Sequence, residues 1–339
     1  MTGTTDFSQA GELVCPAGTP AALRTAVDAG ADSIYCGFRN ATNARNFPGL
    51  NFTPEELEAS VAHAHARGAK VLLALNTYPP AGKVDLWREA AAQGVRAGVD
   101  AFIVADMGVA RHIAETHPGA RLHLSVQAAA PSPEAIRYYC SHFGVQRVVL
   151  PRILTIPEIR QIKREIPCEI ETFIFGNHGL MVEGRCSLTN WLTGLSTNMD
   201  GVCSPAADVT YERDADGAMR SCLAGFTIDR FGPDETAGYP TICKGRYTAP
   251  HRPDGYYAFE EPVSLNLARL LPDLMEAGVH AFKIEGRQRS KSYVRQVVSA
   301  FRHAVDEIRA GATPDLADLA ALTEGQKETQ GAFRTKKWR

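Results

Sequence analysis

Short apolar runs alternate with amphipathic stretches through the first half of the chain, and this alternation predicts repeated strand–helix units. Each apolar run between residues 12 and 167 is rich in β-branched residues, which favours strands, and the stretch that follows repeats its apolar positions with a helical period. The expected strands are 13–15, 33–38, 70–75, 101–105, 122–125, 148–150 and 169–175. The expected helices include 19–29, 53–67, 86–97, 133–143 and 156–165. Such a succession is typical of an α/β protein with a parallel sheet.

The regular pattern breaks between residues 176 and 254, where Gly, Pro, Ser, Asn and Asp accumulate. It returns with an expected helix at 264–277, an eighth strand at 281–284 and a long amphipathic helix at 292–310. Eight strands with intervening helices favour a closed TIM-like (β/α)8 barrel with a cysteine-containing insertion after strand 7. A doubly wound open sheet is the alternative, but CPAGTP follows the first strand where that fold carries a glycine-rich fingerprint.

This organisation divides the chain into four segments. We expect barrel strands 1–7 in residues 1–175, the insertion with its cysteines in 176–263, and barrel closure with the last helix in 264–311. Residues 312–339 form a polar tail that ends in the basic run RTKK, a composition typical of a solvated terminus.

Composition narrows the classes of function. Hydrophobic residues make up 45% and charged residues 22% of the 339 residues, which is typical of a globular protein with a substantial core. The formal net charge of -2 provides no bulk attraction for nucleic acid or anionic membrane, so we expect no nucleic-acid partner. The first residues, MTGTTDFSQAGELVC, have neither the basic start nor the apolar stretch typical of a secretory leader, and no apolar run is long enough to span a membrane, so we expect a cytoplasmic protein.

The chain contains eight cysteines, which a reducing compartment would keep as thiols for metal binding, catalysis or burial. Cys186, Cys203 and Cys243 stand in the turn-rich contexts GRCS, GVCSP and TICKGR, which suit ligation of a bulky cofactor. Thiolates select zinc, copper(I) or iron–sulfur clusters, and the absence of a C-x-x-C pair disfavours a zinc ribbon. From the residues alone, a metal site and buried free thiols both remain open. The other cysteines are expected in the core (Cys36, Cys140 and Cys168) or are ambiguous (Cys15 and Cys222).

Polar residues gather at the expected carboxyl ends of the strands, the face on which barrel proteins place their active sites. Each of them alone is more often a hydrogen-bonding partner of loop backbone than a substrate contact, and their joint position is the stronger signal. They are Cys15, Asn76, Asp106, Gln127, Arg152, Glu171, Asn177, His178, Glu285 and Arg287.

The segment 171–189, ETFIFGNHGLMVEGRCSLT, resembles the signature of the peptidase U32 family, and the resemblance covers nearly the whole chain. Further matching motifs are LVCPAG (13–18), TNARNFPGLNFT (42–53), VLPRIL (149–154), GVCSPA (201–206), AGYPTICKGRY (237–247), EEPVSLN (260–266) and KIEGRQRS (283–290). Within the family this set is most similar to the ubiquinone-biosynthesis proteins of the UbiU type.

The resemblance implies a [4Fe–4S] cluster held by four cysteines, a heterodimer with a UbiV-like protein, and oxygen-independent hydroxylation of the ubiquinone precursor ring. Three of those cysteine positions match Cys186, Cys203 and Cys243, whereas Gly179 stands at the fourth. His178 could supply an imidazole ligand instead, Cys222 could replace the missing thiolate, one iron could stay open, or the cluster could be absent.

The resemblance also implies a small aromatic or prenylated substrate, with prephenate as a candidate oxygen donor. Arg152, Lys244, Arg246 and Arg287 are candidate partners for a carboxylate, or they pair with nearby acids of the chain. As catalytic residues we expect Glu171, Arg152 and Arg287. The alternatives to a hydroxylase subunit are an RNA hydroxylation factor of the same family, a cluster-free binding barrel and, least favoured because GxSxG and HExxH are absent, a peptidase.

Overall fold

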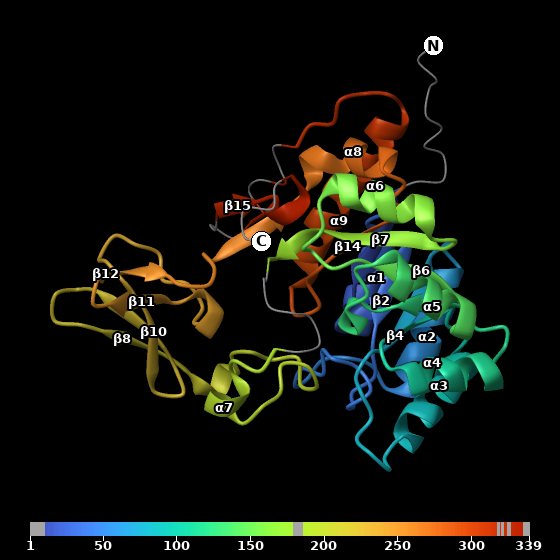
Figure 1. Ribbon diagram of the computed structural model, residues 1–339, viewed down its shortest axis with the longest axis horizontal. Coiled ribbons are helices and arrows are strands. Elements are labelled where there is room, and N and C mark those ends of the chain that lie inside the picture. Colours follow the sequence, from blue (N-terminus) through green and yellow to red (C-terminus); the bar gives the residue numbers. More distant parts are fainter. Residues whose placement is uncertain (1–10, 179–185, 317–318, 320–321, 324–326, 335–339) are drawn as a thin grey trace.

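Eight parallel strands close into a barrel in the computed structural model, which describes residues 11–178, 186–316, 319, 322–323 and 327–334 (Figure 1). Neighbouring strands pair in chain order, and the last strand pairs with both the first and the seventh. The barrel strands are β1 (Glu12–Pro16), β2 (Ser33–Cys36), β3 (Lys70–Leu75), β4 (Ala101–Val104), β5 (Leu122–Leu124), β6 (Val145–Val149), β7 (Glu169–Asn177) and β14 (Ala281–Ile284). The TIM-like barrel expected from the sequence is therefore confirmed.

Helices that follow the strands cover the outside of the barrel, and most begin at a side-chain cap. Thr53 and Thr155 each form a capping box, with Glu56 and Glu158 respectively, which satisfies backbone N–H groups that the first helical turn leaves free. These helices are α1 (Pro20–Asp28), α2 (Pro54–His65), α3 (Asp85–Ala97), α4 (Met107–Thr116), α5 (Pro133–Phe143), α6 (Ile156–Glu165), α8 (Leu271–Glu276) and α9 (Lys291–Arg309). Their apolar faces pack on the strands, so the core lies between the two layers.

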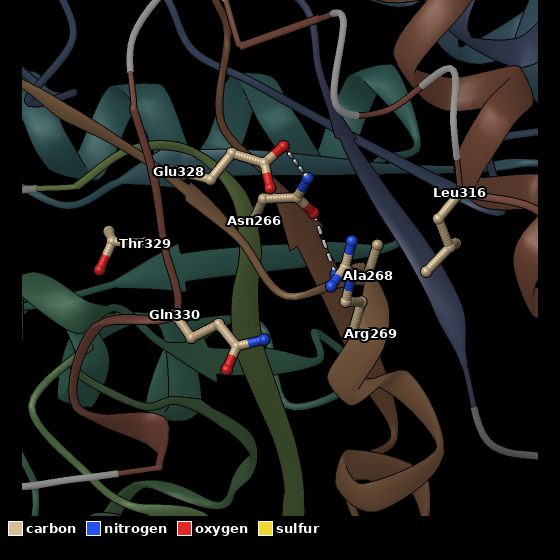
Figure 2. Close-up of a pocket in the computed structure, with 7 residues that line it drawn as sticks. All are labelled: Asn266, Ala268, Arg269, Leu316, Glu328, Thr329 and Gln330. Atoms are coloured by element: carbon tan, nitrogen blue, oxygen red, sulfur yellow. Dashed lines mark hydrogen bonds between the residues drawn. The ribbon is translucent and has the colours of Figure 1, made fainter.

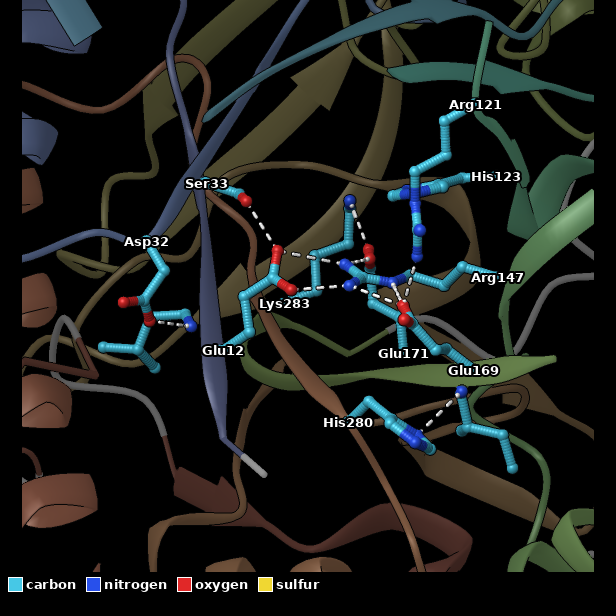
Figure 3. A network of polar contacts seen from close by, with 12 residues as sticks. Glu12, Asp32, Ser33, Arg121, His123, Arg147, Glu169, Glu171, His280 and Lys283 are labelled. Atoms are coloured by element: carbon cyan, nitrogen blue, oxygen red, sulfur yellow. Dashed lines mark hydrogen bonds and ion pairs between the residues drawn. The ribbon is translucent and has the colours of Figure 1, made fainter. Parts of the chain in front are cut away.

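The interior of the barrel near the amino ends of the strands holds charged side chains (Figure 3). Arg147 of β6 is 4% exposed and forms ion pairs with Glu12, Glu169 and Glu171 at 2.5, 2.8 and 3.3 Å. Lys283 of β14 donates to Glu171 at 2.7 Å. These buried charges are paired and hydrogen-bonded with one another, which is the condition under which a low-dielectric interior tolerates them.

The insertion after β7 forms an arm that projects from one side of the barrel (Figure 1). It begins with the short helix α7 (Asn190–Thr193) and continues with a three-stranded sheet of β8 (Val209–Arg213), β9 (Met219–Leu223) and β10 (Phe226–Phe231). A hairpin of β11 (Arg246–Ala249) and β12 (Arg252–Tyr257) completes the arm. The chain then returns to the barrel through β13 (Val263–Asn266), which pairs antiparallel with the end of β7.

The return segment differs from the single helix expected at 264–277. Its first residues form β13, and the α-helix α8 covers only Leu271–Glu276. The sequence SLN at 264–266 is compatible with the period of a helix and with that of a strand. It forms a strand because its backbone pairs with the last residues of β7.

The tail segment 312–339 adds a strand to this edge of the barrel. β15 (Lys327–Thr329) pairs parallel with β13, and Phe333 is buried at 2% exposure in the 3-10 turn η5 (Gly331–Phe333). A cavity of about 230 Å³ lies between β15 and the turn after β13, where Asn266 donates to Glu328 at 2.9 Å (Figure 2). The described part of this tail thus packs on the barrel. Residues 335–337 of the basic run lie outside the described residues.

Among the helices that the structure describes, none is both long and apolar enough to cross a membrane.

A candidate active site at the barrel mouth and its cysteine cluster

Arg287 lies just after β14 at the carboxyl end of the barrel and is the most isolated cation of the site. Its side chain is 8% exposed, and its Nη1 donates to the Asn43 side-chain oxygen at 2.9 Å. Its Nε finds no hydrogen-bond partner among the described residues. Burial lowers the pKa of the guanidinium, and the Tyr35 ring lies 5.1 Å from Cζ. A buried cation with only neutral contacts favours an anionic ligand at this position.

Arg152 and Arg45 share one carboxylate beside Arg287. Arg152 donates to Glu285 at 2.9 Å and lies 3.6 Å above the Phe173 ring, while Arg45 approaches the other oxygen of Glu285 at 4.0 Å. Arg152 and Arg45 therefore share Glu285, and the charges of Arg45 and Glu285 both act on Arg287. Guanidinium forks suit bidentate binding of carboxylates, so these side chains are candidates for binding an anion.

Other polar residues at the strand ends hold the loops of the mouth. Asn76 accepts from the Ala44 backbone N–H at 3.0 Å and donates to Ser125 at 3.3 Å. The Gln127 carbonyl accepts from the Tyr78 hydroxyl at 2.7 Å. Asp106 caps α4 by accepting from the Val109 N–H at 2.9 Å. These contacts give Asn76, Gln127 and Asp106 roles in shaping the site.

Glu171 occupies a different place from the one expected. It is the third residue of the nine-residue strand β7 and is fully buried inside the barrel, so it lies away from the carboxyl end of the strand. Both of its oxygens are engaged, one by Lys283 and one by Arg147 (Figure 3). The expected strand 169–175 already has Glu171 near its amino end, so the assignment of Glu171 to the carboxyl end of the strand was wrong.

Three cysteines of the arm come together beside the barrel mouth. Burial raises the pKa of Cys243 to about 12, and Cys203, Glu260 and Cys186 raise it further through their charges. Asn198 fixes the Cys186 backbone, with its amide donating to the Cys186 carbonyl at 2.9 Å. The three predicted thiols are therefore near enough for their charges to act on Cys243, and they form one candidate site.

The loop that carries Cys203 presses against the mouth of the barrel. Gly201 adopts φ +68°, and a Cβ there would lie 2.1 Å from the Ala44 carbonyl oxygen, so the close approach requires glycine. Ala44 precedes Arg45 in the loop that also provides Asn43. The cysteine site and the cationic mouth are therefore contiguous.

His178 links the mouth to the cysteines. It follows β7, is 4% exposed, and its Nε2 lies 3.6 Å from Glu260 Oε1. The Glu260 N–H donates to the Cys243 carbonyl at 3.1 Å. Burial lowers the pKa of His178 to about 4, with Arg152 and Lys244 adding to the effect. The imidazole is therefore neutral at pH 7, and its Nδ1 lacks a hydrogen-bond partner among the described residues.

The described residues offer no site for a single metal ion. No group of three His, Cys, Asp or Glu side chains among them converges closely enough to hold a single ion. An iron–sulfur cluster is larger than an ion, so its ligands stand farther apart, and three neighbouring thiols with a neutral imidazole are a suitable donor set. Gly179, which stands at the fourth cysteine position of the family, lies outside the described residues.

The remaining candidates lie elsewhere or are already engaged. Cys222 is buried in β9 of the arm, with its Sγ 3.7 Å from the Thr227 hydroxyl, and Cys15 is fully buried in the barrel core. Arg246 pairs with Asp229 at 2.6 Å inside the arm, whereas Lys244 donates to Asn177 at 2.9 Å beside His178. Arg246 is therefore committed to holding the arm together.

Sequence reasoning did not single out four residues of this site: Tyr35, Asn43, Arg45 and Glu260. Asn43, Arg45 and Glu260 lie within the motifs TNARNFPGLNFT and EEPVSLN, which were noted only for their resemblance. Their position in these motifs was the sequence feature that could have identified Asn43, Arg45 and Glu260 as site residues.

Together these features define a TIM-like barrel protein with a cationic mouth and an adjoining group of thiols. The model of peptidase family U32 matches residues 18–336, and the chain belongs to that family. An uncharacterized protease of Methanocaldococcus jannaschii is 31% identical over 309 residues, covering 90% of this chain and 67% of the relative. The tRNA hydroxylation protein P of Escherichia coli is 30% identical over 327 residues, covering 92% and 71%.

Two further proteins are similar to the chain. The 23S rRNA 5-hydroxycytidine C2501 synthase of Escherichia coli is 28% identical over 320 residues, covering 94% of this chain and 42% of the synthase. A solved U32 peptidase structure aligns with 49% of this chain and 70% of its own at 20% identity, with a TM-score of 0.42. Proteins named for hydroxylation thus recur among the relatives.

Proposed function

We propose that the chain is a UbiU-like subunit of a hydroxylase that adds a hydroxyl group to the ubiquinone precursor ring without using oxygen. The observation that carries the proposal is the contiguity of a cationic barrel mouth with three thiols, joined through His178 and Glu260. The motifs shared with UbiU-type proteins along the chain and the relatives named for hydroxylation support the same class.

In this proposal Cys186, Cys203 and Cys243 hold a [4Fe–4S] cluster, and His178 supplies the fourth contact. When bound, such a cluster supplies one-electron transfer at a potential set by its ligands and surroundings. The chain itself keeps the His178 imidazole neutral by burying it, and neutral imidazole is the form that ligates metals.

The mouth binds a carboxylate of the substrate or of an oxygen donor of the prephenate type. Arg287 provides a buried guanidinium that donates a hydrogen bond to the neutral Asn43, and Arg152 and Arg45, which share Glu285, lie beside it. The Tyr35 ring beside Arg287 gives an aromatic ligand a surface to pack against.

A UbiV-like protein is the proposed partner, and the arm provides a surface for it. Trp191 of α7 is 94% exposed, and Phe226 and Phe259 are 63% and 55% exposed. Exposed aromatic side chains are typical anchors of protein interfaces. Because these residues lie in the insertion that also carries the three thiols, the partner would cover the side of the molecule that holds the proposed cluster.

Anaerobic purification with iron and sulfide quantification tests the cluster. We expect Cys186→Ala and His178→Ala to lower the iron content, whereas the matched control Cys222→Ala retains it because Cys222 lies in the arm sheet. Undiminished iron in Cys186→Ala would overturn the cluster assignment. Loss in Cys186→Ala alone would remove His178 from the ligand set.

RNA hydroxylation is the second candidate function, and the names of two relatives, a tRNA hydroxylation protein and a 23S rRNA synthase, favour it. The near-neutral net charge of the chain argues for a small-molecule substrate instead. Deletion of the gene followed by anaerobic growth separates the two. Accumulation of an unhydroxylated quinone precursor supports our proposal, whereas loss of a hydroxylated nucleoside from RNA with normal quinone supports the alternative.

A further inference from the structure

Two cysteines that the sequence placed separately in the core meet at the amino end of the barrel. Cys140 lies on α5 and Cys168 immediately precedes β7. The two thiols lie close enough for each to shift the pKa of the other. Both also line one cavity of about 380 Å³. Their proximity is a product of the fold, because α6 and β6 separate them along the chain.

The surroundings of the pair make one sulfur the nucleophile. Cys140 is half-buried and accessible, whereas Cys168 is 5% exposed. Because Cys140 is the more accessible sulfur, it is the one that a peroxide reaches first, and its interaction with Cys168 lowers its pKa. Lys163 lines the same cavity and its charge acts on Cys168, whereas Arg121 of the cavity is paired with Glu169 at 2.6 Å.

We propose that Cys140 and Cys168 are a redox-active dithiol that a peroxide converts into an intramolecular disulfide. The Cys140 thiolate attacks one peroxide oxygen, the O–O bond breaks, and Cys140 sulfenic acid forms with release of hydroxide. The Cys168 sulfur then attacks the sulfenic sulfur, the S–S bond forms, and water leaves. The hydroxide takes up a proton, so that two thiols lose two electrons and two protons while one peroxide becomes two waters.

This pair is separate from the proposed cluster site. Cys168 and the cysteines of the arm lie beyond opposite ends of β7, whose nine residues span about 30 Å. Other residues of the same cavity, including Arg121, Glu169 and His280, border the buried charge network (Figure 3). Oxidation would therefore tie α5 to the start of β7 without altering the three thiols of the arm.

Peptide mapping of the full chain after treatment with hydrogen peroxide tests the proposal. Trypsin releases Cys140 in residues 138–147 and Cys168 in residues 165–185. We expect these two peptides to be joined by a disulfide that dithiothreitol cleaves, with a loss of two alkylatable thiols. The control Cys222→Ala should give the same linked pair, and Cys140→Ser should give none.

A second variant, Cys168→Ala, tests the same reaction without requiring detection of the linked peptides. In Cys168→Ala the resolving thiol is missing, so the Cys140 sulfenic acid should accumulate and be trapped by dimedone. Retention of both thiols as alkylatable groups after peroxide treatment would overturn the proposal. So would oxidation of Cys140 to sulfinic acid in the wild-type chain without a linked pair, because Cys168 would then not be its resolving partner.

Discussion

Two buried arginines of the same barrel, Arg147 and Arg287, differ in what surrounds their charge. Arg147 contacts three carboxylates, whereas Arg287 bonds only to the neutral Asn43 side chain. A buried charge is stable when it is paired and costly when it is not. Arg147 therefore stabilises the barrel through its three ion pairs, whereas the neutral surroundings of Arg287 support our proposal that it binds a ligand.

Replacing each arginine by methionine separates these roles. Arg147→Met leaves buried carboxylates without their cation and should lower the free energy of unfolding by about 3–5 kcal/mol. Arg287→Met removes a buried cation without stranding an acid, so its free energy of unfolding should equal or exceed that of the wild type while hydroxylation is lost. Urea unfolding and product formation measure both variants. Severe destabilisation by Arg287→Met would contradict the ligand role.

His178 predicts a dependence of stability on pH. Its pKa is about 4 in the folded protein against 6.5 for an ordinary histidine, so between these values the unfolded chain binds a proton that the folded chain does not. The contribution of His178 to the free energy of unfolding is therefore fully present above pH 6.5, and it decreases by about 3 kcal/mol as the pH falls to about 4. Urea unfolding of the metal-free protein at several pH values, compared with His178→Asn, measures this slope. Equal slopes in the two proteins would contradict the buried neutral imidazole.

At the scale of elements, the barrel strands were predictable because their apolar runs are short and bounded by helices with caps. The eight expected strands all appear, with β6 beginning at Val145 rather than 148. The strands β13 and β15 were not predictable from pattern, because each exists only by pairing with a neighbour distant in the chain. The same edge pairing brings η5 against His178.

Gly331 of η5 packs against His178 and so joins the tail segment to the candidate site. It adopts φ +55°, and a Cβ there would lie 2.7 Å from Cε1 of His178. Gly331→Ala should therefore displace η5, expose Phe333 and accelerate limited proteolysis of the tail, with iron content as a second readout. Gly311→Ala, whose Cβ would meet nothing within 4 Å, controls for the positive φ alone. Equal proteolysis rates for the two variants would rule out the packing contact.

At the scale of the whole molecule, the arm and the barrel meet where the three thiols and the mouth adjoin. A cluster bound by three loops would cross-link them, as metal binding commonly does when it orders a fold. Hydrogen exchange should therefore be slower in residues 186–204 and 241–247 of cluster-loaded protein, with barrel strands unchanged. Identical exchange of loaded and metal-free protein in those loops would argue against ligation there.

The barrel, the position of the insertion, the family and the three candidate cysteines were all predictable from the amino-acid sequence. These follow from local periodicity, turn chemistry and motifs, which are properties of neighbouring residues. Three features come from the folded chain alone: Arg287 meets Asn43 across 244 positions, Glu171 is held inside the barrel, and Cys140 and Cys168 line one cavity. Such contacts depend on strand register and on side-chain direction in a closed barrel, and no local pattern in the chain encodes them.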